Sequence, residues 1–78
     1  MTFERLRAFY IARPFQRFIM HLADGRQVPV EHPEWIMLMP GGRTVYVTQR
    51  DETVNVVDLL LVTDLEIKPA TASQGAQA

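Results

Sequence analysis

The chain contains no cysteine and only one serine among its 78 residues. Without cysteine, it can form neither a disulfide bond nor a thiolate metal site to supplement its core. The single serine, Ser73, lies in a polar C-terminal segment that has few side chains to bury. Because the usual nucleophiles are absent or badly placed, the sequence predicts a protein that is not an enzyme.

Long hydrophobic runs are also missing. No apolar segment approaches the ~18 residues that cross a bilayer. The first residues, Met1 to Glu4, lack the charged and then apolar pattern of a signal peptide. We therefore expect a cytoplasmic protein without a membrane partner.

Length and composition predict one small domain. The sequence is 47% hydrophobic and 22% charged, with a formal net charge of -1. A domain of this size buries only about 60% of the surface of its unfolded chain, so its core is marginal. We expect a homo-oligomer, because association is the remaining common way to bury more apolar surface. Near-neutral charge argues against a general polyanion binder, although residues 1–26 carry five arginines against two acids.

The start of the chain predicts a short helix over residues 2–12. Thr2 is a suitable N-cap, and the residue before Pro14 is disfavoured in a helix. Apolar side chains recur there at three-to-four spacing and form one stripe: Phe3, Leu6, Phe9 and Tyr10. This stripe is expected to lie across a sheet.

After the helix, the pattern predicts short strands separated by turns. The clearest signal is Asp24-Gly25 between two apolar-patterned runs, which is typical of a β-hairpin. Pro29 cannot donate a ladder hydrogen bond, so its strand is expected at an edge or with its open side there. After the interruption at residues 31–34, the second strand is expected to resume over residues 35–39. Further strands are expected over residues 43–49, 53–57 and 62–67, with one helical turn at residues 58–61 that Asp58 could cap.

Alternation along these strands predicts the core. One face of the first strand is expected to carry Phe18, Met20 and Leu22, and one face of the second Val28 and Val30. The side chains expected inside are Val45, Val47, Val54 and Val56, together with Trp35. The expected fold class is mainly β (α+β), with an N-terminal helix and a five-stranded, strongly bent antiparallel sheet. Residues 1–67 form the single expected domain, and residues 68–78 are expected to be a disordered tail.

Two segments carry a family resemblance. Phe18 to Gly25 resembles the first strand and turn of Sm-like proteins, and Val56 to Val62 resembles their fourth strand, short turn and fifth strand. The layout is similar to bacterial Hfq and archaeal Sm-like proteins. That resemblance implies a small barrel whose subunits pair strand edges and close into a ring, with RNA as the ligand. Where Hfq carries a Lys-His pair, this chain has Val57-Asp58.

A second resemblance covers most of the chain. Arg13-Pro14-Phe15, His21 to Arg26 and His32-Pro33-Glu34 form a layout that is similar to a group of small uncharacterised bacterial proteins. This resemblance implies no particular activity.

These observations favour a non-catalytic module that self-assembles and mediates protein interactions. The strand at residues 35–39 is apolar on both faces, which predicts that both faces are buried, one of them by the helix or a second subunit. The candidate interface residues are Ile36, Met37, Leu38, Val57 and Leu61. The alternative is an Sm-like RNA binder that uses Arg5, Arg7, Arg13, Arg17, Tyr46 and Arg50, with tyrosine stacking on bases.

His21 and His32 are the only side chains with an ordinary pKa near neutrality. With Asp24, Glu31 and Glu34 they could form a metal or acid–base cluster, but no recognised metal-ligand spacing is present. We therefore expect no metal site and no cofactor.

Overall fold

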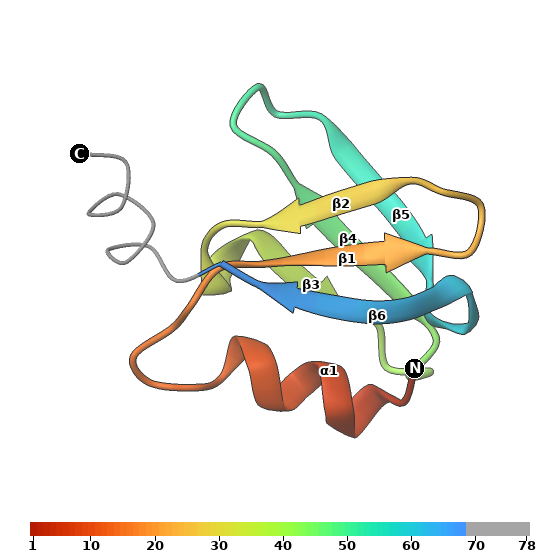
Figure 1. The fold of residues 1–78 in the computed structure, drawn as a ribbon, viewed down its shortest axis with the longest axis horizontal. Coiled ribbons are helices and arrows are strands. Elements are labelled where there is room, and N and C mark those ends of the chain that lie inside the picture. Colours follow the sequence, from red (N-terminus) through yellow and green to blue (C-terminus); the bar gives the residue numbers. More distant parts are fainter. Residues whose placement is uncertain (69–78) are drawn as a thin grey trace.

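The computed structural model describes residues 1–68, which form one helix, six strands and two 3-10 turns (Figure 1). The elements in chain order are α1 (Phe3–Tyr10), β1 (Phe18–Leu22), β2 (Gln27–Val30), η1 (Pro33–Trp35), β3 (Ile36–Leu38), β4 (Thr44–Thr48), β5 (Val54–Asp58), η2 (Leu59–Leu61) and β6 (Val62–Ile67). The tail expected over residues 68–78 lies outside the described residues, apart from Lys68.

The strands form two antiparallel sheets with the orders β2-β1-β6 and β3-β4-β5. The mainly β, α+β class with an N-terminal helix is therefore confirmed. The strand count was wrong: there are six strands rather than five, and residues 1–68 do not form a closed barrel. The reason is the segment from Glu31 to Trp35, where η1 separates β2 from β3 and sends them into different sheets.

Helix α1 begins where the sequence predicts and ends two residues earlier. The Thr2 hydroxyl oxygen accepts a hydrogen bond from the backbone N–H of Arg5 at 3.1 Å. This N-cap satisfies one of the donors that a helix start leaves unpaired. Leu6 is fully buried, and Phe3, Phe9 and Tyr10 pack against the core, as the stripe predicts.

The core lies between the two sheets and α1. Phe18 packs edge-on against Phe9, with ring centroids 5.6 Å apart, and lies 6.2 Å from the Phe15 ring. The buried faces of β1, β2 and β4 agree with the predicted alternation. The fully buried side chains of largest volume are Phe18, Leu6, Met20, Leu59, Val30, Val45, Val47 and Val57.

The register of β5 contradicts the prediction. Val54 and Val56 are 53% and 55% exposed, whereas Val57 is buried. The preceding loop determines this register. The backbone N–H of Gln49 donates to the backbone carbonyl of Thr53, and only three residues lie between them. This loop sets Asn55 opposite Val47, so the other set of side chains faces the core. A further correction concerns Trp35, which is half-buried beside the sheet rather than in the core.

The three-residue loop also places Glu52 at a φ of 70°, in the left-handed region. That conformation is typical of the last residue of such a loop and suits glycine. We expect Glu52→Gly to raise the free energy of unfolding by about 0.5–1 kcal/mol. The strain energy that glycine removes from the folded state is larger than the entropic cost of ordering a more flexible residue. Urea denaturation measures this change, and Glu52→Ala is the matched control. An equal gain in the alanine variant would show that the lost charge, not the backbone, is responsible.

Candidate interaction surface

Apolar side chains line up across the solvent side of the β3-β4-β5 sheet. Met37 lies directly opposite Tyr46, and Tyr46 lies directly opposite Val56. Their exposed fractions are 59%, 38% and 55%. With Val54, they form a surface that we name the outer face. Directly opposed side chains on neighbouring strands are close enough to touch, so the outer face is one continuous apolar strip.

One end of the outer face contains a hollow of about 230 Å³. Trp35 from η1 forms its wall beside Met37, Tyr46 and Val54. The Trp35 ring is fixed by His32, whose ring packs edge-on at a centroid distance of 4.3 Å. The Arg50 guanidinium lies 6.0 Å from the Trp35 centroid, at the limit of a cation–π contact. Two aromatic side chains are therefore presented together on this face.

The predicted interface residues divide between surface and interior. Met37 and Leu61 are exposed, with 59% and 40% of their surface accessible. Leu38 is half-buried, while Ile36 and Val57 belong to the core. The outer side of β3 is open to solvent in the single chain, and the side chain that points outward there is Met37.

Val54 and Val56 were expected in the core, but both lie on the surface. The length of the loop before β5 could have indicated their position. Adding or removing one residue in this loop would exchange the side of β5 that faces the core with the side that faces solvent.

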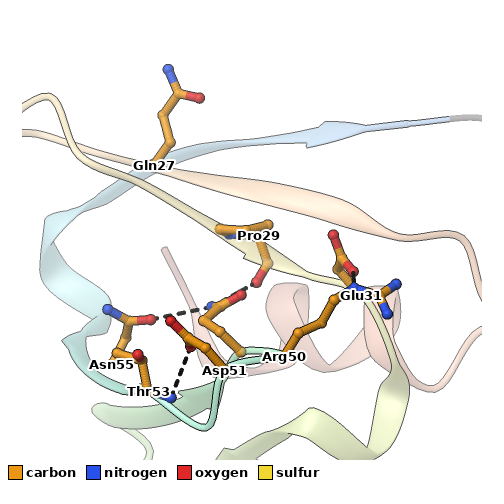
Figure 2. Close-up of a pocket in the computed structure, with 8 residues that line it drawn as sticks. Gln27, Pro29, Glu31, Arg50, Asp51, Thr53 and Asn55 are labelled. Atoms are coloured by element: carbon orange, nitrogen blue, oxygen red, sulfur yellow. Dashed lines mark hydrogen bonds and ion pairs between the residues drawn. The ribbon is translucent and has the colours of Figure 1, made fainter.

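A polar groove of about 560 Å³ separates β2 from the β4–β5 hairpin (Figure 2). The Gln49 side-chain N–H₂ group crosses it and donates to the Pro29 carbonyl at 3.1 Å and to the Asn55 side-chain oxygen at 3.2 Å. At one end, the Arg50 guanidinium donates to the Glu31 carboxylate at 3.1 Å. Side chains, rather than backbone pairs, therefore connect the two sheets at this corner.

Two of the arginines considered for RNA binding form ion pairs with the same carboxylate. Arg17 and Arg50 both pair with Glu31, at 3.7 Å and 3.1 Å. Arg13 instead folds back to donate to the carbonyls of Tyr10 and Ala12. The remaining candidates lie on α1 (Arg5 and Arg7) and on the outer face (Tyr46). The arginine charge is thus spread over several elements.

Most of the side chains considered for a metal or acid–base cluster pair with other partners. Within residues 1–68, no group of three or more suitable ligand side chains could hold a metal ion. His21 instead lies 2.9 Å from the Glu66 carboxylate across the β1–β6 pair. This hydrogen bond, followed by the one from Lys68, lowers the pKa of Glu66 below its ordinary value.

The η2 turn is fixed by Asp58. Its carboxylate accepts a hydrogen bond from the Leu60 backbone N–H at 2.9 Å, as the sequence predicts for a cap. That bond, with a further contribution from Arg43, lowers the pKa of Asp58. Asp58 is therefore ionised at neutral pH and holds the end of β5 in place.

No family model, curated protein or solved structure matches the chain. Within the described residues, no helix has the length and apolar character that a membrane crossing needs.

Proposed function

We propose that this chain is a non-catalytic module that associates with itself and mediates protein interactions through its outer face. The observation that carries the proposal is the exposed row of Met37, Tyr46 and Val56 across three strands. Contiguous apolar patches on soluble proteins commonly mark sites of protein interaction. The small size of the domain adds to the argument, because association would cover surface that its own core cannot.

We further propose that the two sheets are an open variant of the Sm-like small barrel. Three features support this proposal. The first strand lies between β2 and the last strand, β6. A one-turn helix connects β5 to β6. The N-terminal helix packs against the same core as both sheets.

The first experiment is the solution mass of the protein, measured by size-exclusion chromatography with light scattering at protein concentrations about a hundredfold apart. We expect a mass above that of one chain at the higher concentration. Met37→Glu should lower that mass, because a carboxylate in a covered apolar face would lose its hydration.

Thr63→Glu is the matched control, since Thr63 is exposed on β6, in the other sheet. It should keep the wild-type mass. A single-chain mass for the wild-type protein at both concentrations would contradict self-association.

The alternative function is RNA binding. It is favoured by the pair of aromatic side chains, Trp35 and Tyr46, in one hollow with Arg50 above the indole ring. Bases stack on such side chains, and arginine adds a phosphate contact. Fluorescence anisotropy with a labelled single-stranded oligonucleotide tests this function. Binding that weakens steeply with added salt would support it, and no binding at low salt would exclude it.

A further inference from the structure

The two sheets leave four strands with one unpaired side, namely β2, β6, β3 and β5. An unpaired edge exposes backbone N–H and C=O groups to other strands, and natural proteins protect such edges. Within residues 1–68, three of the four edges have a recognisable form of protection, and β5 has none.

Edge β2 is protected by proline and by a side chain. The Leu22 N–H donates to the Arg26 carbonyl, so alternation places the backbone groups of Gln27, Pro29 and Glu31 on the open side. Pro29 has no N–H to offer there, which agrees with the sequence-based expectation. Its carbonyl already accepts the hydrogen bond from Gln49.

Edges β6 and β3 are protected in other ways. Figure 1 shows α1 running below β6, and residues of both elements line a hollow of about 410 Å³ that includes Arg5, Thr63 and Leu65. The β6 strand also carries Asp64 and Glu66, and its pairing with β1 contains a register shift. Strand β3 is only three residues long. A short, charged or irregular edge is a poor template for another strand.

Edge β5 is five residues long and regular, and it contains no proline or lysine. The Gln49 N–H donates to the Thr53 carbonyl, and the Leu59 N–H donates to the Arg43 carbonyl. Odd-numbered residues of β5 therefore pair with β4, and the backbone N–H groups of Val54 and Val56 point away from the sheet. The exposed side chains above these groups are two valines, which suit a strand pair.

We propose that β5 pairs antiparallel with β5 of a second copy of this chain, about a two-fold axis at Val56. The two β3-β4-β5 sheets then become one six-stranded sheet. This inference rests on the proposed self-association and adds an edge contact to it. The pair leaves the outer face uncovered and joins the two outer faces into one longer apolar surface, which further association would cover. A two-fold contact uses the same surface on both copies. The β5 edge therefore has to be complementary only to the β5 edge of the second copy.

The apolar row favours this register, and the charges along β5 disfavour one of its neighbours. With Val56 opposite Val56 of the second copy, the apolar row of Tyr46 and Met37 continues across both molecules, and Val54 faces Asp58. The register in which Val56 faces Val54 of the second copy instead sets Asp58 opposite Glu52, and like charges directly opposed destabilise a pair. The contact also differs from a ring, in which each subunit offers two different edges to its neighbours.

The test uses the absence of cysteine from the natural sequence, which allows a single cysteine to report one contact. Val56→Cys should form a disulfide-linked dimer under mild oxidation, because residues opposite each other in an antiparallel pair have Cα atoms about 5.5 Å apart. Val54→Cys is the matched control in the same strand, with 53% exposure against 55%. In this register its two copies lie about 13 Å apart along the strands, too far for a disulfide.

We expect Val56→Cys to cross-link at least about tenfold faster than Val54→Cys, and the difference to vanish in denaturant. Val56→Lys, which keeps the strand but charges its edge, should reduce the wild-type mass to that of a single chain. Circular dichroism of each variant verifies that it is folded.

Several results would overturn the pairing. Equal cross-linking of both cysteine variants would indicate random collision. An associated wild-type protein without a Val56→Cys cross-link would leave self-association intact but reject this contact, and so would a ring-sized mass. A wild-type protein that remains a single chain would reject both this pairing and the proposed self-association.

Discussion

Phe18→Ala is expected to unfold most of the protein at room temperature. Phe18 is 1% exposed and packs against Phe9 and Phe15, so its ring connects β1 to α1 and to the segment that follows α1. Truncation of a buried phenylalanine to alanine costs about 3–5 kcal/mol. A core of this size rarely supplies more than about 3–5 kcal/mol in total. The loss therefore approaches the entire free energy of unfolding.

Urea denaturation followed by circular dichroism measures the effect. Ile67→Ala is a suitable control, because Ile67 lies directly opposite Phe18 on β6 but is 43% exposed. It should cost about 1 kcal/mol or less. Similar losses in both variants would mean that Phe18 is not the centre of the core.

Leu6→Ala is the second large expected effect. Leu6 is the only fully buried residue of α1, and it lies within the apolar stripe through which the helix packs against the core. We expect a loss of about 3 kcal/mol in the free energy of unfolding. Because isolated helices of this length are marginal in water, the helical signal should fall with the tertiary structure and not persist after it.

Arg7→Ala separates packing from helix propensity. Arg7 is exposed on the same helix, and alanine is the better helix former, so its replacement should change stability by less than about 0.5 kcal/mol. If Leu6→Ala behaved like Arg7→Ala, α1 would not belong to the core.

Local patterns were sufficient for the parts of the fold that single turns and caps determine. Thr2 and Asp58 cap their helical turns as the sequence predicts, and the Asp24-Gly25 hairpin joins β1 to β2. In β1 and β4, buried apolar residues alternate with residues that are half-buried or exposed. Their buried faces were therefore predictable from residue order alone.

The candidate surface was only partly predictable. The outward position of Tyr46 and the presence of an apolar outer side on β3 could be expected from the sequence. The row across three strands could not, because it depends on Val56 and hence on the register of β5. The division into two sheets at Glu31 to Trp35 could not be predicted either. Pro33 is compatible both with a bend within one sheet and with a change from one sheet to the other.

The sequence alone determined the order of elements, the helix cap, the first hairpin and the absence of any cysteine-based chemistry. Each of these depends on residues a few positions apart. Tertiary structure decided that there are two sheets rather than one, that Trp35 lies beside the sheet and that Val54 and Val56 face solvent. Valines occupy both faces of β5, so periodicity cannot choose between them, and the backbone of the preceding loop makes that choice.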